Sequence, residues 1–503
     1  MELLDNLALG LATAATFENL AWCFVGVFLG TFIGVLPGIG PLAAVAMLLP
    51  VSFYLPPETA LVMLAGVYYG SEYGGSISSI LLNIPGTPSA SVTCLDGYPM
   101  AQQGRAGVAL FMTAIASFFG GIFGVGVMVG LSPVLADFAL RFGPAEYFSV
   151  MVLGLVAASV VSGSGALRGV MMVCLGVLIG TVGIDVNSGE TRYTGGIAQL
   201  RDGLSLVVVA MGLFGIAEVM TSARGATRSY AGQKVTLRGF LPTAPEWLRS
   251  IGPAIRGAGI GSFFGTLPGT GQTVASFVGY ALEKRISPRA SAFGTGTVEG
   301  VVVPETANNA AAQTAFIPTL TLGIPGSATM ALMLGALMIH GITPGPRLIP
   351  DHPELFWGLV VSFLFGNLFL LILNIPLIGL WVRLLRVPHT LLYPTVVVLI
   401  CIGVYSIDNS VFDVWVTLVF GLVGYVLRLF RFEPAPLLIG FVLGPAMEEY
   451  FRRAMLLSRG DAMVFLDRPG SAALLGVSAL LLIASALPIR RWLAAGMRPA
   501  RRD

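Results

Sequence analysis

Long continuous runs of apolar residues dominate the chain. The longest cover residues 106–131, 146–161, 204–220, 355–380 and 412–427. A bilayer core of roughly 30 Å requires about 20 apolar residues per helix, and these runs approach or exceed that length. With interrupted segments included, the pattern predicts about ten to twelve membrane-crossing or re-entrant elements. Continuous rather than alternating runs favour helices over a barrel, so we expect an all-α integral membrane protein.

Composition supports lipid as the solvent of this chain. Of 503 residues, 55% are apolar and 11% are charged, and the mean hydropathy is +0.85. That leaves too little polar surface for a soluble protein of this size. The net charge is +2 and no long basic block interleaves with aromatic residues, so nucleic acid is not an expected partner. The four scattered cysteines predict neither a disulfide framework nor a metal site, and we expect no bound cofactor.

Two motifs each occur twice, in the same order. GTFIGVLPGIG at 30–40 recurs 231 positions later as GSFFGTLPGTG at 261–271, and NIPGTPSA at 83–90 has the counterpart GIPGSATM at 323–330. Recurrence of both motifs in one order predicts an internal duplication. We therefore divide the chain at its repeats, and the parts are a first half at 1–222, a basic cytoplasmic linker at 223–251, a second half at 252–430, and C-terminal helices with a basic tail at 431–503.

Charge predicts that the two halves are inverted in the membrane. The segment before the first motif carries Glu2, Asp5 and Glu18 and no base, whereas residues 223–256 contain six bases and one acid. Lysine and arginine near helix ends favour the cytoplasm. The first copy is then entered from outside and the second from the cytoplasm. This is a recurring plan of secondary transporters, which hold their substrate near the midplane between the halves.

The second motif predicts a re-entrant hairpin. Its flanking apolar stretches, 257–267 and 271–283, would reach only about 17 to 20 Å each as helices. Bases stand at both outer ends, so both ends are expected on the cytoplasmic side, with a helical hairpin whose tip is 267–271. Non-helical backbone at membrane depth is tolerated where it is buried in protein or lines a wet cavity.

A Pro-Gly-x-Gly tip frees backbone groups for a ligand, because proline lacks an amide donor and glycine allows close approach. A helix that begins after the tip directs unpaired amides toward a carboxylate. Carbonyls that end the preceding half-helix, those of Gly34 and Gly265, would suit Na⁺. The candidate substrate-binding residues of the tips are Pro37, Gly38, Gly40, Pro268, Gly269, Thr270 and Gly271. The alternative is a pair of structural kinks, since both residue types are common in membrane helices.

Polar residues inside apolar stretches add further candidates. Asn308 and Asn309 could bind a cation or an anion, and Glu305 could be a cation ligand or a protonation site. Glu72 occupies a comparable place in the first half, where packing and binding are equally compatible with the sequence. For the 303–314 segment the alternative is a polar packing seam. The second motif completes the candidate substrate-binding set with Asn83, Gly86, Thr87, Gly326 and Ser327.

These residues resemble the large membrane subunit of the tripartite tricarboxylate transporter family, the TctA-like permeases. The stretches that carry the likeness include GVLPGIGPLAAVAMLLP, YYGSEYGGS, TCLDGYPMAQQGRAG, EGVVVPETANNAAAQTAFIPTLTLGIPG and EPAPLLIGFVLGPAMEE. Thr270, where a third glycine is expected, and Thr87 with Pro88 depart from the pattern. The resemblance implies a small membrane subunit of about four helices and a periplasmic solute-binding protein as partners.

The resemblance further implies a permease of the bacterial inner membrane that imports a di- or tricarboxylate or a related organic anion, driven by a Na⁺ or H⁺ gradient. No Gly-x-x-x-x-Gly-Lys-Ser/Thr phosphate loop is present in the sequence, which agrees with transport that does not use ATP. Three alternatives stay open at this point: a stand-alone organic-anion carrier, a passive pore, and a membrane-embedded enzyme that uses Glu305 or Ser164.

The predicted inversion can be tested by labelling. In a variant without native cysteines, single cysteines at Asn19 and Gly232 should react with an impermeant thiol reagent from opposite sides of the membrane. Labelling of both positions from the periplasm would contradict the inversion.

Overall fold

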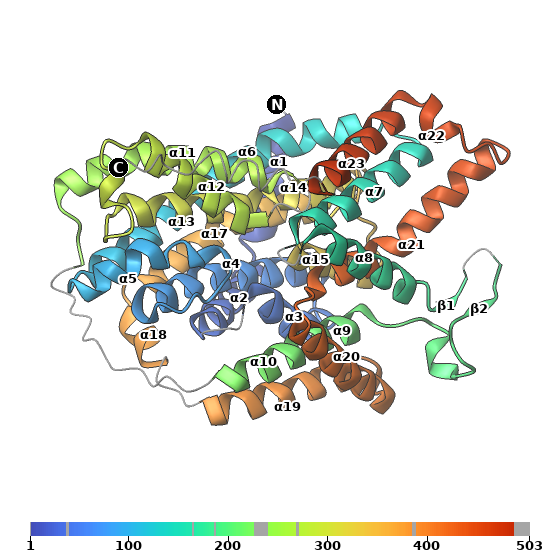
Figure 1. Cartoon of the computed structure of the whole chain (residues 1–503), viewed down its shortest axis with the longest axis horizontal. Coiled ribbons are helices and arrows are strands. Elements are labelled where there is room, and N and C mark those ends of the chain that lie inside the picture. Colours follow the sequence, from blue (N-terminus) through green and yellow to red (C-terminus); the bar gives the residue numbers. More distant parts are fainter. Residues whose placement is uncertain are drawn as a thin grey trace, which may run out of the picture. The chain divides into compact units, whose positions relative to one another are not determined.

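The computed structural model describes residues 2–36, 40–162, 165–185, 188–225, 240–267, 271–384 and 389–486. Regular structure in these ranges is almost wholly helical, which confirms the predicted fold class (Figure 1). Of the described helices, 6 are long and apolar enough to cross a membrane: Phe17–Val35, Ala106–Ala139, Pro144–Val161, Leu206–Ala223, Pro353–Asn374 and Val411–Leu429. Several shorter apolar helices accompany them, so the predicted span count stays a prediction.

The chain forms two compact units. Unit 1 combines Met1–Leu140 with Leu204–Leu427, and unit 2 combines Arg141–Gly203 with Arg428–Asp503. This grouping differs from the division at 222, 251 and 430 because it follows contacts, whereas that division follows sequence repeats. The two predicted halves therefore stay a prediction about repetition.

Unit 1 holds both copies of the repeated motifs. Its helices are α1 (Glu2–Ala14), α2 (Phe17–Val35), α3 (Pro41–Ser52), α4 (Pro57–Leu82), η1 (Ser89–Ser91), α5 (Cys94–Gln102), α6 (Ala106–Ala139), α9 (Leu206–Ala210), η3 (Met211–Ile216), α10 (Ala217–Gly225), α11 (Ala244–Gly265), α12 (Gly271–Ile286), η5 (Ala290–Ala292), α13 (Glu299–Thr314), α14 (Phe316–Leu322), α15 (Ala328–Ile339), α16 (Leu348–Asp351), α17 (Pro353–Asn374), α18 (Ile378–Leu384), α19 (His389–Asp408) and α20 (Val411–Leu429). Among these, η3 has π-helical geometry.

Helix α11 is longer than the sequence pattern predicted. A capping box starts it within the predicted linker, where Thr243 is the N-cap and its backbone N–H donates to Glu246 Oε2 at 2.9 Å. Its 22 residues reach about 33 Å, longer than the arm predicted from 257–267, but α11 is not among the described helices that are both long and apolar enough to cross a membrane. The apolar pattern alone missed the first turns because they are polar.

Helix α12 runs back along α11. The Arg256 guanidinium in α11 donates to both carboxylate oxygens of Glu283, near the far end of α12, at 2.8 and 2.7 Å. Arg256 lies nine residues before the end of α11 and Glu283 twelve residues after the start of α12, so a contact between them requires that the chain reverse between the two helices. Residues 268–270, between the two helices, lie outside the described ranges, so the conformation of the tip stays a prediction.

Three glycines spaced four residues apart press α2 against α4. A Cβ atom on any of them would lie within 2.2–2.3 Å of a carbonyl oxygen of α4, so a larger side chain does not fit. Small residues at this spacing let two helix backbones approach closely, which is a common way to pack helices in membranes. The contacts are Gly26 with Met63, Gly30 with Val67, and Gly34 with Ser71.

The same arrangement occurs between α11 and α13. Here the contacts are Gly257 with Val303, Gly261 with Ala307, and Gly265 with Ala311, and a Cβ atom added to each glycine would lie 2.7, 2.2 and 2.5 Å from the carbonyl oxygen of its partner. Each glycine lies 231 positions after its counterpart in α2, and each partner lies 240 positions after its counterpart in α4. The repetition seen in the motifs therefore extends to the helix contacts. Inversion relative to a membrane stays a prediction.

Unit 2 is built from the segments that flank the second part of unit 1. Its elements are α7 (Pro144–Val161), α8 (Ala166–Gly180), β1 (Gly183–Ile184), β2 (Thr191–Arg192), η2 (Ala198–Leu200), α21 (Pro434–Leu457), α22 (Val464–Asp467) and α23 (Pro469–Ala486). The strands β1 and β2 pair antiparallel, with Gly183 opposite Arg192.

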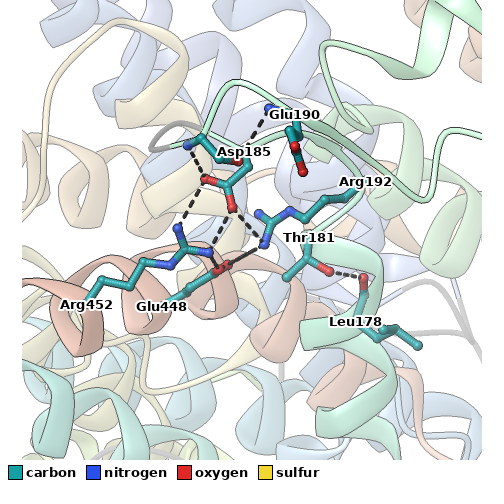
Figure 2. A network of polar contacts seen from close by, with 8 residues as sticks. Leu178, Thr181, Asp185, Glu190, Arg192, Glu448 and Arg452 are labelled. Carbon is teal, nitrogen blue, oxygen red and sulfur yellow. Dashed lines mark hydrogen bonds and ion pairs between the residues drawn. The ribbon is translucent and has the colours of Figure 1, made fainter. Parts of the chain in front are cut away.

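Four ion pairs link Asp185, Arg192, Glu448 and Arg452, and two of them, Arg192 with Glu448 and Arg452 with Asp185, join the β1–β2 hairpin to α21 (Figure 2). Asp185 lies 2.8 Å from Arg452 and 3.4 Å from Arg192, and Glu448 lies 2.8 Å from Arg192 and also pairs with Arg452. Within this hairpin the Gly189 N–H donates to the Asp185 carbonyl at 2.8 Å. Residues 186 and 187 lie outside the described ranges.

The fold also improves the labelling experiment. Asn19 is only 6% exposed, and its side-chain amide donates to the Thr13 carbonyl at 2.8 Å, so a cysteine there would react poorly. Phe17, at the start of α2, is 89% exposed and is the better reporter.

The glycine contacts can be tested by a matched pair of alanine variants. Gly30→Ala places a Cβ 2.2 Å from the Val67 carbonyl oxygen and should cost about 1–3 kcal/mol of stability. Gly126→Ala, in an exposed part of α6 with open space around the new atom, should be neutral or gain up to about 1 kcal/mol from helix propensity. Thermal unfolding of the purified protein measures both. Equal melting temperatures would show that α2 can move away from α4 at little cost.

Candidate functional site

Helices α4 and α13 bring the polar residues of unit 1 together (Figure 1). All residues of α13 are buried, and α4 is buried from Thr59 to Leu81. Three side-chain pairs cross between the two helices, and they are Tyr69 with Gln313, Glu72 with Asn308, and Ser76 with Glu305. From one pair to the next the residue number increases in α4 and decreases in α13, so the two helices run antiparallel.

Glu72 lies at the meeting point of four elements. Its Oε2 accepts hydrogen bonds from Asn308 Nδ2 of α13 at 3.0 Å and from Ser89 Oγ of η1 at 2.9 Å. Its Oε1 accepts from Gln272 Nε2, in the first turn of α12, at 3.3 Å. The same Gln272 amide also donates to the Tyr68 hydroxyl. The sequence left the role of Glu72 open. The structure shows that this residue is only 1% exposed and lies inside the polar cluster.

The loop after α4 delivers Ser89 to this carboxyl group. Asn83 ends α4 in the left-handed conformation, with φ 56°, and its side chain is exposed. Thr87 Oγ1 lies 2.8 Å from Ser89 Oγ and accepts from the Ala90 N–H at 3.2 Å. A Cβ on Gly86 would come within 2.4 Å of Gly75 Cα, so the loop can pass this close to α4 only with glycine there. Of the candidates in this motif, Gly86 and Thr87 shape the loop that reaches Glu72.

Gly34 and Gly265 serve helix packing in this structure. Each points its Cα toward the partner helix, as described above, and each carbonyl oxygen faces the second motif of its own half. The Gly34 carbonyl lies 2.8 Å from the position of a Cβ on Gly86, and that of Gly265 lies 3.8 Å from the position of a Cβ on Gly326. The predicted use of these carbonyls as cation ligands stays a prediction.

Glu305 occupies a second polar cluster, farther along the same helix pair. Its carboxylate accepts from three hydroxyls, those of Ser76 at 2.7 Å, Ser117 at 3.2 Å and Thr93. Asn309 does not reach this carboxylate, because its Nδ2 donates to the Glu305 backbone carbonyl at 3.0 Å. The neighbouring residues Asn308 and Asn309 thus have different contacts, which their adjacency in sequence did not indicate.

The second copy of the loop has a different environment. Gly323 ends α14 in the left-handed conformation, with φ 70°, as Asn83 ends α4. Ser327 is the N-cap of α15, and its hydroxyl accepts from the Met330 N–H at 3.3 Å. A Cβ on Gly326 would meet its nearest atom at 3.7 Å, an ordinary contact. Ser327 therefore has a structural task, and the loop does not supply a counterpart of the Ser89 contact with Glu72.

Much of both tips lies outside the described residues. These candidates are Pro37, Gly38, Pro268, Gly269 and Thr270. At the edges, Gly40 is the N-cap of α3 and Gly271 begins α12 with φ 62°, and a Cβ on either would meet no atom within 4 Å.

Sequence reasoning missed Gln272, Ser89 and Tyr68. Gln272 follows the second tip directly, where the first copy has Pro41, so comparison of the two copies could have singled it out. Ser89 and Tyr68 carry no comparable signal, because serine and tyrosine are common in membrane helices and loops. Only the packing of α4 against α12 and α13 shows that both contact the cluster.

The cluster around Glu72 is better suited to bind a cation than to bind a carboxylate ligand. An ionised acid repels an anion, and among the described residues no lysine or arginine pairs with Glu72 or Glu305. An uncompensated buried charge is costly, so such residues mark ion or proton sites in membrane proteins. The amides that begin α12, on the other hand, could favour an anion beside the same cluster.

Several helices that are long and apolar enough to cross a membrane, together with a cluster of buried polar side chains, are typical of a multi-pass membrane transport protein. Residues 20–439 match the family model described as "Tripartite tricarboxylate transporter TctA family". The chain belongs to this family, which consists of transporters and not of enzymes, and whose members work with partner subunits.

Two relatives come from Agrobacterium vitis. An "uncharacterized 52.8 kDa protein in TAR-I ttuC' 3'region" is 49% identical over 488 residues, which cover 97% of each chain. An "uncharacterized protein in TAR-II ttuC' 3'region" is 54% identical over 228 residues, which cover 45% of this chain and 94% of that relative. No solved structure matches the chain.

The three hydroxyls around Glu305 make a stability prediction. Glu305→Leu removes their shared acceptor and leaves Ser76, Ser117 and Thr93 to be satisfied elsewhere, at about 1–3 kcal/mol for each hydroxyl that finds no partner. Glu305→Gln keeps a carbonyl acceptor of nearly the same shape and should cost about 1 kcal/mol or less. Thermal unfolding should therefore rank leucine well below glutamine. The opposite rank would mean that the hydroxyls do not depend on residue 305.

Proposed function

We propose that the chain is the permease subunit of a binding-protein-dependent secondary transporter that imports a di- or tricarboxylate or a related organic anion, driven by a cation gradient. The observation that carries this proposal is the family match over residues 20–439, together with the relative that matches over 97% of the chain. The cluster of buried polar side chains between α4, α12 and α13 agrees with it, because transporters place their sites in such interiors.

The carboxylate substrate is proposed to bind at the tips of the repeated motifs. Helices α3 and α12 begin directly after the tips, at Pro41 and Gly271, and a helix N-terminus favours negative charge. Gln272 connects the start of α12 to Tyr68 and Glu72, so a ligand at this tip would lie next to the cluster. Because the two sites would be neighbours, binding of the anion at the tip and of the cation at the Glu72 cluster would be coupled.

Na⁺ or H⁺ is proposed as the coupling ion, and the partners are proposed to be a small four-helix membrane subunit and a periplasmic solute-binding protein. The location that fits these partners is the bacterial inner membrane. Partner subunits as such are a property of the family, and their identity here is part of the proposal. A stand-alone carrier would need neither partner, and the following experiment separates the two.

Uptake should depend on the binding protein. Permease reconstituted in liposomes with its small membrane subunit should take up little labelled dicarboxylate or tricarboxylate until the solute-binding protein is added. Addition should raise the initial rate at least about tenfold, because capture of the substrate then precedes its entry. Rate against binding-protein concentration is the measurement.

The control is the same liposomes with a binding protein of another transport system. Full-speed uptake without any binding protein would indicate a stand-alone carrier. Absence of trans-stimulation by unlabelled acid inside the liposomes would indicate a pore, and a changed chemical identity of the acid would indicate an enzyme.

A further inference from the structure

Within the described part of the chain, the side-chain carbonyl oxygen of Asn308 has no hydrogen-bond partner. Asn308 Nδ2 donates to Glu72, but Oδ1 accepts no hydrogen bond from the described residues, although Asn308 is only 1% exposed. An unsatisfied buried carbonyl typically costs about 1–3 kcal/mol. Because one atom of this amide bonds to the Glu72 carboxylate, its free oxygen lies beside the same acid.

The internal repeat explains why this oxygen lacks a donor. The counterpart of Asn308 is Tyr68, 240 positions earlier, and the Tyr68 hydroxyl accepts from Gln272. The counterpart of Gln272 is Pro41, 231 positions earlier, which has neither a side-chain amide nor a backbone N–H. Asn308 therefore stands where Tyr68 accepts a hydrogen bond in the first copy, but Pro41, which stands in place of the donor Gln272, cannot donate to it.

The two buried acids differ in what surrounds them. Glu305 accepts from hydroxyls, and a hydroxyl can also accept, so that cluster can satisfy either an ionised or a neutral acid. Glu72 accepts from two amide NH₂ groups, which only donate, and from Ser89. Two of the three donors to Glu72 cannot accept, so its surroundings favour an ionised carboxylate more than those of Glu305 do, and no base in the described ranges pairs with it.

We propose that a Na⁺ ion binds between the Glu72 carboxylate and Asn308 Oδ1. Carboxylate and amide oxygens are the ligands that hard cations prefer, and the ion would satisfy the free carbonyl and balance the acid at once. The counterpart of Glu72 is Ala312, so the repeat supplies this pair of ligands once and not twice. This inference rests on the proposed function, in which a cation gradient drives transport, and it assigns the coupling ion and its ligands.

The test is binding of radioactive Na⁺ to the purified full-length chain in detergent or nanodiscs, without substrate. Wild type should bind about one ion per chain, with a Hill coefficient near one. Glu72→Gln should abolish this binding, and Asn308→Ala should weaken it at least about tenfold, since each variant removes one proposed ligand. Asn374→Ala is the matched control, because Asn374 is also buried with a free Oδ1 but lies in α17, where its amide bonds only to the Leu370 carbonyl. It should bind Na⁺ as wild type does.

Several results would overturn the inference. Wild-type affinity in Glu72→Gln would do so, as would loss of binding in Glu305→Gln but not in Glu72→Gln, which would move the site to the other acid. Absence of Na⁺ binding by wild type, with uptake driven by a proton gradient alone, would exclude Na⁺ here. Size-exclusion profiles and melting temperatures establish that each variant is folded.

The same liposomes separate this inference from the proposed function. If wild type imports carboxylate on a Na⁺ gradient and Glu72→Gln does so equally well, the site assignment fails and the function stands. If wild type binds Na⁺ through Glu72 but imports no organic anion with its partners present, the function fails and the site stands.

Discussion

Polar groups buried among apolar helices must find their partners inside the protein, and this constraint orders unit 1. Helix α13 is buried along its whole length although it carries Glu305, Asn308 and Gln313. Each of these side chains is met by a residue of α4 directly across the contact. Such pairing allows a polar helix to lie at the centre of a membrane protein without a large energetic penalty. The Asn308 side-chain oxygen, which finds no partner within the described ranges, is consequently the most informative atom of the cluster.

Glycine determines how closely the helices that carry these groups can approach. The glycine faces of α2 and α11 bring each helix backbone against its long partner, α4 or α13, at matching positions of the two copies. The frame is thus repeated, whereas the chemistry placed on it is not. Glu72 is matched by Ala312, Asn308 by Tyr68, and Gln272 by Pro41. The two copies thus share a packing frame but carry different polar side chains on it.

Unit 2 relies on a different interaction. Asp185, Glu448, Arg192 and Arg452 balance one another and hold a short hairpin against α21 (Figure 2). None of these residues is adjacent to its ion-pair partner in sequence except for Glu448 and Arg452, which lie one helical turn apart. Long-range pairs of this kind leave no periodic signal, so the compact grouping of 141–203 with 428–503 could not be read from the repeats.

The sequence by itself determined the helical membrane fold, the duplication and the family, because apolar runs and recurring motifs are local signals. It also pointed to the segment that contains Glu305, Asn308 and Asn309. It could not decide between Asn308 and Asn309, which differ only in the direction each takes from α13, or assign a role to Glu72. The tertiary structure separates the two asparagines and places Glu72 in the polar cluster, since the antiparallel crossing of α4 and α13 aims Asn308 at Glu72 and leaves Asn309 bonded to its own helix. The direction of each side chain and the distance between helices depend on how distant segments pack together, and the periodicity of apolar residues along the sequence does not show this packing.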